Sequence, residues 1–308
     1  MSDSQLQFVE AQGTRFACLV EGTGPLVLLL HGFPDTARSW DALRPTLARR
    51  GFRAVSPFLR GYHPSAIPSR DTDQETLARD VVGLIDALGG PAIVVGHDWG
   101  ASAAYGAAGL APERITQLIT IAIPHPATLR PTPRKVWGVR HFLAYKMPGA
   151  AARFARNDFE GLTQIVRRWS PTWAPSPEEL GPVRETFAHA ESLDAAFGYY
   201  RALSFSPTHS LRARIRVPTV AFCGTDDPMT DRSDFERARR MFEGDYAIEE
   251  MPGGHFMHRE HPDVFEARLF ARLNTAGVVR EADPKQLRRP GEPGTPAARS
   301  APSQARDR

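Results

Sequence analysis

The chain has 308 residues, of which 42% are hydrophobic and 24% charged, as is typical of an ordinary globular protein. Residues 280–308 carry seven Lys or Arg and four Asp or Glu, so the preceding 279 residues hold 31 charges of each sign. This neutral body argues against nucleic acid as the main partner. No apolar run approaches the roughly 18 residues of a membrane span, and Cys18 and Cys223 provide neither a disulfide framework nor a metal-ligand spacing.

The two ends of the chain predict no folded element. The first residues, M-S-D-S-Q-L-Q, lack the basic and apolar regions of a signal peptide, so we expect a cytoplasmic protein. Residues 279–308 are rich in Pro, Gly, Ala and Ser and have almost no large apolar side chain. Such a segment cannot bury enough surface to order itself, and we expect a disordered tail there.

Strands and helices alternate through the first part of the chain. Short apolar, β-branched runs between turn residues predict strands, and apolar residues at a spacing of three and four predict helices. The predicted strands are residues 6–21 (two strands around Gln12-Gly13), 26–30, 52–58, 91–97 and 115–123. The predicted helices between them are residues 37–50, 76–88 and 101–110.

The pattern changes in the middle of the chain. Residues 129–207 contain no convincing strand, only helical segments interrupted by prolines and rich in large aromatic residues. Alternation then resumes with strands at 219–223 and 246–251 and helices at 233–241 and 262–273. Alternating strands and helices indicate an α/β protein whose mostly parallel sheet, here of eight strands, is flanked by helices on both faces. We expect a core of residues 1–128 and 208–278 with an inserted helical lid at 129–207.

One strand and the helix after it enclose a reactive residue. Gly96 and Gly100 flank Asp98 in G-H-D-W-G, between a buried strand and an Ala-rich helix. This strand, tight turn and helix form the pattern of a nucleophile elbow, with a carboxylate where serine is usual. A carboxylate that attacks an sp³ carbon forms an ester, which water can open. The simpler alternative is that Asp98 only caps the following helix.

Other strand ends carry further candidate groups, because ligands of such sheets lie at the carboxyl ends of the strands. They are Gly32-Phe33, Asp226-Asp227 and His255. The chain order of nucleophile, acid and histidine is that of the α/β-hydrolases.

Taken together, H-G-F-P-D at 31–35, G-H-D-W-G at 96–100, a helical lid and G-G-H at 253–255 resemble the epoxide hydrolase group of the α/β-hydrolase fold, to which haloalkane dehalogenases are related. The resemblance spans roughly residues 5–275. It implies that Asp98 is the nucleophile and that His255 activates the hydrolytic water, with His258 and His261 as the alternative histidines. The family's acid usually comes three residues after the glycine that ends the strand, which favours Asp227 over Asp226.

The resemblance also implies roles for the residues around the nucleophile. The backbone N–H groups of Phe33 and Trp99 would form the oxyanion hole. The lid would donate protons to the epoxide oxygen through Tyr200, in G-Y-Y-R, and through His141, where the family commonly has a tyrosine. Tyr145 and Tyr199 are the fallback donors. The expected substrate-binding side chains are Trp99, Trp137, Tyr145 and Tyr199.

Two side chains next to these motifs have less specific roles. Asp35 either holds the hydrolytic water or forms a salt bridge with Arg60, and His97 is structural. No motif for a nucleotide, metal or other cofactor is present, so no cofactor is implied.

The predicted function is therefore epoxide hydrolysis. A small apolar epoxide and water are the expected partners of a monomer or homodimer. Haloalkane or haloacid dehalogenation with the same nucleophile is the alternative, and a non-catalytic ligand-binding protein on this scaffold is a further one.

Overall fold

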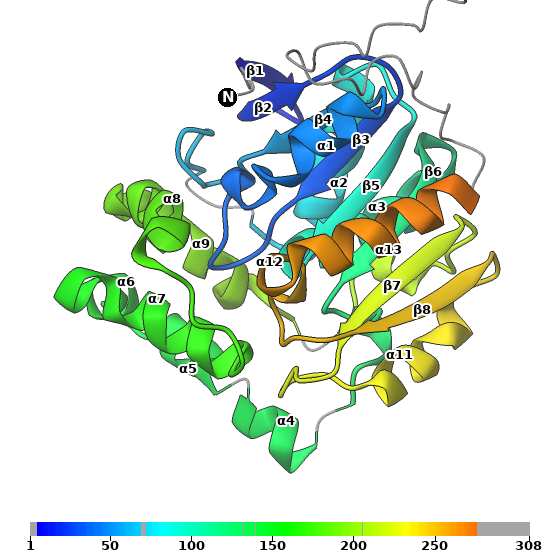
Figure 1. Cartoon of the computed structure of the whole chain (residues 1–308). Helices are drawn as coiled ribbons and strands as arrows, with labels where there is room; N and C mark the ends of the chain where they lie inside the picture. The colour runs from blue at the N-terminus through cyan, green and yellow to red at the C-terminus, as the bar shows by residue number, and fades with distance from the viewer. Residues whose placement is uncertain (1–4, 69–71, 131, 139, 205, 276–308) are drawn as a thin grey trace, which may run out of the picture.

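The computed structural model describes residues 5–68, 72–130, 132–138, 140–204 and 206–275. Its centre is one eight-stranded sheet with the strand order β1-β2-β4-β3-β5-β6-β7-β8 (Figure 1). The strands are β1 (Gln5–Ala11), β2 (Thr14–Glu21), β3 (Leu26–Leu30), β4 (Arg53–Pro57), β5 (Ala92–His97), β6 (Ile115–Ile121), β7 (Thr219–Gly224) and β8 (Tyr246–Met251). The pairs β1–β2 and β2–β4 are antiparallel, and all the other pairs are parallel. The predicted fold, a mostly parallel eight-stranded sheet, is confirmed.

Helices cover both faces of the sheet because its central strands are apolar on both faces. Val27 and Leu29 of β3 pack with the helices of one face, α1 (Leu43–Arg49) and α13 (Pro262–Thr275). Leu28 and Leu30 of the same strand point to the other face. That face is covered by α2 (Gln74–Ala87), α3 (Trp99–Leu110) and, over β7, α11 (Arg232–Ala238).

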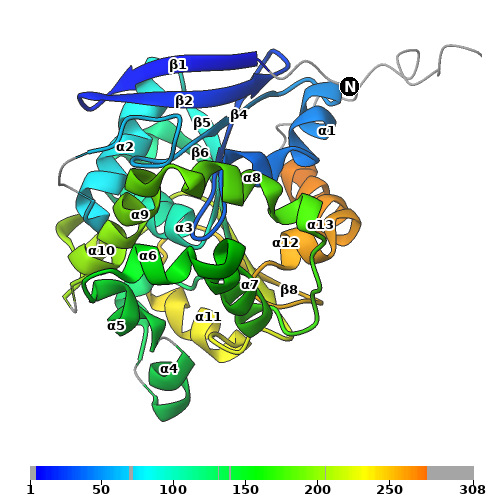
Figure 2. The same ribbon diagram turned by 90° about the vertical axis from the view of Figure 1, so that its left-hand side faces the viewer.

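A group of helices separates β6 from β7 in the chain. It consists of α4 (Pro133–Gly138), α5 (His141–Lys146), α6 (Ala150–Phe154), α7 (Arg156–Trp169), α8 (Pro177–Ala188) and α9 (Ala190–Ala202). Among the described residues of 129–207 there is no strand. Figure 2 shows α6, α7, α8 and α9 in front of the sheet, on the side where the parallel strands end. Two short helices, α10 (His209–Arg212) and α12 (Met257–Glu260), complete the chain's α-helices in the described residues.

Helix bounds differ from the predicted ones where the backbone changes geometry. The single helix expected at 37–50 is a 3₁₀ turn, Ala37–Trp40, followed by α1. Pro45, in the first turn of α1, has no N–H to continue a hydrogen-bonded ladder from the preceding turn, which disfavours one uninterrupted helix. The tail expected at residues 279–308 lies outside the described residues. Within the described residues, none of the helices has the length and apolar composition to cross a membrane.

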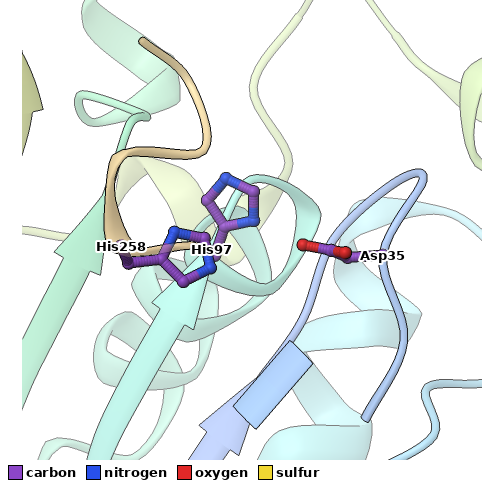
Figure 3. A group of neighbouring side chains, drawn as sticks. All are labelled: Asp35, His97 and His258. Carbon is purple, nitrogen blue, oxygen red and sulfur yellow. The ribbon is translucent and has the colours of Figure 1, made fainter. Parts of the chain in front are cut away.

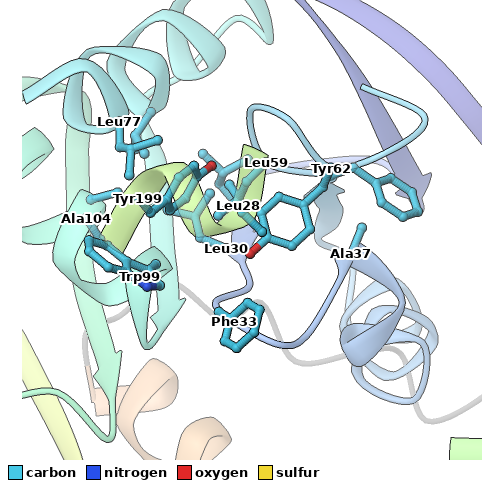
Figure 4. Close-up of a cluster of buried hydrophobic side chains, with 14 of the residues drawn as sticks. Leu28, Leu30, Phe33, Ala37, Leu59, Tyr62, Leu77, Trp99, Ala104 and Tyr199 are labelled. Carbon is cyan, nitrogen blue, oxygen red and sulfur yellow. The ribbon is translucent and has the colours of Figure 1, made fainter. Parts of the chain in front are cut away.

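A cluster of buried side chains joins the sheet to the helices of residues 129–207, the predicted lid (Figure 4). Leu28 and Leu30 of β3 lie in it together with Phe33, which follows that strand. Trp99 of α3 packs edge-to-face against Tyr199 of α9, with 5.5 Å between the ring centroids. The predicted lid is therefore anchored by apolar contacts next to the strand ends that carry the candidate residues.

Candidate active site

Asp98 lies in the sharp turn between β5 and α3. Its φ of 51° and ψ of −116° are a rarely populated backbone conformation, which a residue keeps only when the surrounding packing imposes it. A Cβ atom on Gly96 would lie 2.5 Å from the Gly100 carbonyl oxygen, and one on Gly100 would lie 2.5 Å from the His31 carbonyl oxygen. The two glycines therefore allow the close approach that the turn needs, and the Asp98 side chain is left 12% exposed.

A backbone donor holds one oxygen of this carboxylate. The Phe33 N–H donates to Asp98 Oδ1 at 2.8 Å. A Cβ on the preceding residue, Gly32, would lie 2.5 Å from the same oxygen, so only glycine fits there. Trp99 is the first residue of α3, where a backbone N–H has no acceptor within the helix. Of the two N–H groups predicted as an oxyanion hole, that of Phe33 thus contacts the carboxylate, and that of Trp99 belongs to the residue that follows Asp98 in the chain.

His255 lies between two carboxylates. Its Nε2 is 3.5 Å from Asp98 Oδ2, and its Nδ1 is 3.4 Å from Asp227 Oδ2. Burial by itself lowers the pKa of His255, but the hydrogen bonds and negative charges of Asp227 and Asp98 outweigh burial and raise this pKa to about 9. The pKa of Asp98 is lowered: burial opposes this shift, while His255, His97 and the Phe33 N–H favour the ionised carboxylate. The resting pair is a carboxylate and an imidazolium.

The two neighbouring acids of the β7 loop have different surroundings. Asp227 is buried and fixed by the Met229 N–H at 2.8 Å and the Thr230 hydroxyl at 3.1 Å, in addition to its contact with His255. Asp226 is exposed and accepts hydrogen bonds from the Gly253 N–H and the Thr225 hydroxyl. The structure therefore brings Asp227 to the histidine and leaves Asp226 outside.

Tyr200 of α9 faces the same region from the lid. Its ring centroid lies 5.2 Å from that of Trp99 and 5.5 Å from that of Phe33. The hydroxyl is buried and has no hydrogen-bond partner among the described residues. Burial and the nearby Asp98 charge raise its pKa well above the usual value, so the hydroxyl keeps its proton. An unpaired, protonated hydroxyl of this kind is available to a bound molecule.

His141, the other lid residue predicted to donate a proton, is oriented differently. Its Nδ1 lies 3.1 Å from the Gly138 carbonyl oxygen, an acceptor, so Nδ1 carries the proton of the neutral ring. Burial lowers the pKa of His141 to about 3, so the ring is neutral at pH 7. The other nitrogen, Nε2, is buried without a partner among the described residues and has no proton to donate. In this geometry His141 is an acceptor.

The structure does not bring all the predicted substrate-binding residues together. Trp137 is 69% exposed on α4, where Arg140 covers its ring. Tyr199 is buried, and its hydroxyl donates to the Arg60 carbonyl oxygen at 2.7 Å, so it holds the lid to the core. Tyr145 does reach the site, because its ring lies 5.1 Å from that of Tyr200 and 5.4 Å from that of Phe33.

Asp35, His97 and His258 form a buried group (Figure 3). The ring of His97 lies 4.9 Å from that of His255, centroid to centroid. One ligand atom from each of the three residues of the group lies within 4.8 Å of the others, a spacing that a metal ion could use. However, Arg259 forms an ion pair with Asp35, so a divalent cation would lie beside a fixed positive charge, which disfavours it. The suggested Asp35–Arg60 pair is wrong, because Arg60 pairs with Asp80 instead. His97 Nε2 donates to the His255 carbonyl oxygen, 3.0 Å away, and supports that loop.

A comparison with protein-family models identifies the fold family. Residues 25–262 match the model of the alpha/beta hydrolase fold. The chain belongs to the α/β-hydrolase fold family. The matched range begins just before β3 and runs to the start of α13, so it includes the elbow, both loop acids and the histidine.

Individual relatives of this α/β-hydrolase include epoxide hydrolases. Epoxide hydrolase A of Mycobacterium tuberculosis is 28% identical over 309 residues, which cover 85% of this chain and 95% of that protein. The AB hydrolase superfamily protein YfhM of Bacillus subtilis is 29% identical, with 86% and 96% covered. The crystal structure of a Bacillus megaterium epoxide hydrolase in complex with an inhibitor matches with a TM-score of 0.78 and 23% identity, over 87% of this chain and 100% of that one. The resemblance predicted from the motifs is confirmed.

The sequence pattern did not identify one residue of this α/β-hydrolase site. Trp169, at the end of α7, packs edge-on against His255 with 4.9 Å between the ring centroids. Its carbonyl oxygen accepts the His255 N–H at 2.8 Å, and its indole N–H is buried without a partner among the described residues. Nothing in its spacing separates it from the other lid aromatics, because only the folded lid places it over the histidine.

Proposed function

We propose that this α/β-hydrolase opens epoxides to vicinal diols through an ester on Asp98. The observation that carries the proposal is the arrangement of three groups: the Asp98 carboxyl group, the His255 ring, whose Nε2 lies 3.5 Å from it, and the buried Tyr200 hydroxyl, which has no partner among the described residues. A nucleophile, a base for water and a proton donor are the groups that this reaction needs. The many epoxide hydrolases among its relatives support the same proposal.

In the first step the substrate alkylates Asp98. Oδ2 forms a bond to an epoxide carbon, and the bond between this carbon and the ring oxygen breaks. The electron pair stays on that oxygen, which takes the proton of Tyr200. Oδ1, held by the Phe33 N–H, becomes the carbonyl oxygen of the ester.

In the second step water hydrolyses the ester. Alkylation removes the negative charge of Asp98, which is one of the two charges that raise the pKa of His255. The imidazolium then gives up its proton, which restores the Tyr200 phenolate left by the first step to the hydroxyl, and His255 becomes a base whose orientation is fixed by Asp227. His255 takes a proton from water, the hydroxide attacks Asp98 Cγ, and the negative charge on Oδ1 is stabilised by the Phe33 and Trp99 N–H groups. Cleavage of the bond from Cγ to Oδ2 releases the diol as Oδ2 takes the proton that His255 removed from water, and transfer of the remaining carboxyl proton of Asp98 to His255 restores the resting pair.

Tyr200 is the principal proton donor in this scheme. His141, an acceptor in its neutral form, donates through Nε2 only as an imidazolium or after its ring has turned. We also propose that residues 129–207 act as a lid, since they supply Tyr200, Tyr145 and Trp169 to the site.

Mass spectrometry with a styrene-oxide-like epoxide tests the reaction. We expect a diol without added metal or cofactor. His255→Gln should still be alkylated but should not release product, so its intact mass should rise by the mass of the substrate. His261→Gln, which changes a half-buried histidine of the same segment, is the matched control and should turn over normally. Normal turnover by His255→Gln would refute the mechanism.

The neighbouring acids of the β7 loop offer a second matched pair. Asp227→Asn removes the charge at His255 Nδ1 and should slow hydrolysis of the ester strongly, because the imidazole loses its orienting partner. Asp226→Asn, at the exposed neighbour, should leave turnover close to that of the wild type. Equal effects of the two substitutions would contradict the assignment.

Dehalogenation is the second candidate, because of Trp169. A leaving halide needs two N–H donors and no acid, and the buried indole N–H of Trp169 is available beside His255, with Trp99 as the other donor. Halide release from a haloalkane without diol from any epoxide would favour this function. Tyr200→Phe separates the two reactions, because it removes the proton donor that only epoxide opening requires.

A further inference from the structure

We propose that a cavity on the lid binds an anionic group of the substrate, so that the preferred epoxides carry a carboxylate. This inference rests on the proposed function and specifies its substrate class. The cavity has a volume of about 330 Å³ and lies among α5, α6 and α7. Its charged lining consists of three arginines, Arg140, Arg153 and Arg168, and among the described residues no acid lines it.

None of the three guanidinium groups is neutralised by the described residues. Within the part of the chain that the structure describes, none of them forms an ion pair with a carboxylate. Arg140 and Arg153 each donate to a backbone carbonyl oxygen, those of Trp137 and Pro148, both at 2.7 Å. The Arg168 guanidinium makes neither a hydrogen bond nor an ion pair there. Three guanidinium groups around one cavity therefore retain donors for an anion.

Acids near the cavity have other partners. Gln164, a lining residue, donates to Glu160 at 2.8 Å, and Glu160 also accepts from Asn157 at 2.9 Å. Burial, followed by the charge of Arg140, lowers the pKa of Arg168, which agrees with an excess of positive charge around it. Opposite charge supplied by a ligand would relieve this repulsion.

The cavity shares a wall with the catalytic groups. His141 and Tyr145 line it, and the same two rings face inward: Tyr145 lies 5.1 Å from Tyr200, and His141 lies 4.9 Å from Trp169, centroid to centroid. His141 and Tyr145 thus connect the lining of the cavity to Trp169 and Tyr200 of the candidate site. A substrate with its anionic end at the arginines and its epoxide at Asp98 must pass these two side chains.

The rest of the lining is apolar. It comprises Ala144, Ala150, Phe154 and Ile165, with the ring of Tyr145 at the inner wall. Such a surface suits a hydrocarbon linker, while the arginines suit its charged end. The expected substrate is therefore an epoxide joined by an alkyl chain to a carboxylate.

A matched pair of substrates tests the proposal: an epoxide with an alkyl-linked carboxylate and the methyl ester of the same molecule. The wild type should convert the carboxylate with about tenfold or higher kcat/KM than the ester, through a lower KM. Arg168→Gln should lower this acid-to-ester ratio about tenfold. Arg167→Gln, which removes an exposed charge from the adjacent position of the same helix, should keep the ratio of the wild type. Thermal melting verifies that both variants are folded.

The outcomes separate this inference from the proposed function. Equal kcat/KM for acid and ester, with no change in Arg168→Gln, would overturn the carboxylate site and leave epoxide hydrolysis intact. The same ratio change in Arg167→Gln as in Arg168→Gln would also overturn it, because general surface charge would then explain the preference. If neither epoxide is converted, calorimetric titration with the saturated alkyl carboxylate decides. Binding that Arg168→Gln weakens would support the carboxylate site and reject epoxide hydrolysis. Absence of binding would reject both the carboxylate site and epoxide hydrolysis.

Discussion

Replacing Asp98 by asparagine removes one of the two carboxylates that flank His255, and the effect should be visible in the pH dependence of stability. In the folded wild type the pKa of His255 is about 9, above its ordinary value of 6.5. Its protonated form therefore stabilises the fold fully below pH 6.5, and this stabilisation is lost as the pH rises through 9. Asp98→Asn lowers the folded-state pKa, so most of this loss should already be complete at a lower pH.

The magnitude follows from the linkage between proton binding and folding. For one group, the free energy of unfolding falls by about 1.4 kcal/mol for each pH unit between the pKa of the unfolded state and that of the folded state. Between about pH 7.5 and 8.5 the His255 contribution of the wild type should therefore fall by about 1 kcal/mol. Over the same pH interval the free energy of unfolding of Asp98→Asn should fall by less than about half of that amount, because His255 in this variant is already largely neutral at these pH values.

Urea unfolding of both proteins at about pH 7.5 and 8.5 measures this difference. Other titrating groups are common to the two proteins and cancel when the changes are compared. Intact mass at the end of each experiment verifies that the introduced asparagine has not deamidated. Equal losses of unfolding free energy in the two proteins would refute the coupling of His255 to Asp98, and with it the release of a base by alkylation.

Three further substitutions have distinct expected effects. Gly32→Ala would place a Cβ 2.5 Å from Asp98 Oδ1, so turnover should fall by about a hundredfold or more, measured as diol formation. Asp80→Asn removes the carboxylate that pairs with the buried Arg60 guanidinium and should cost about 3 kcal/mol in urea unfolding. Tyr200→Phe should lower epoxide opening by about 10²-fold or more while halide displacement is unchanged.

Each of these substitutions has a control in the same chain. Gly181→Ala, where an added Cβ meets nothing within 4 Å, should leave turnover unchanged. Asp86→Asn breaks a half-exposed ion pair with Arg114 and should cost less than about 1 kcal/mol. Tyr199→Phe removes the hydrogen bond to the Arg60 carbonyl and should reduce stability more than chemistry. If a control substitution has an effect as large as that of the substitution it is paired with, the structural reason given for the latter is wrong.

Local signals were sufficient for much of this protein. The strands β3, β5 and β7 are continuous apolar runs, and such runs predict buried parallel strands from the sequence alone. The turn with Gly96 and Gly100 around Asp98 is likewise local, because its glycines are required by backbone contacts within a few residues and with the adjacent strand β3. Helix bounds were less accurate where a proline changed the backbone geometry, as at Pro45.

Tertiary structure decided the roles that depend on what surrounds a side chain. Asp226 and Asp227 are adjacent in the chain, but only Asp227 is buried against His255. His141 Nδ1 faces a carbonyl oxygen, so the ring proton is on Nδ1 and Nε2 has none to donate. No spacing in the sequence encodes that contact. Asp35 pairs with Arg259, 224 positions away, instead of with Arg60. The sequence by itself therefore determined the fold and the position of the Asp98 carboxylate in the turn between β5 and α3, because both follow from short-range patterns. Proton positions, ion-pair partners and the arginine-lined cavity depend on long-range packing, which only the folded chain specifies.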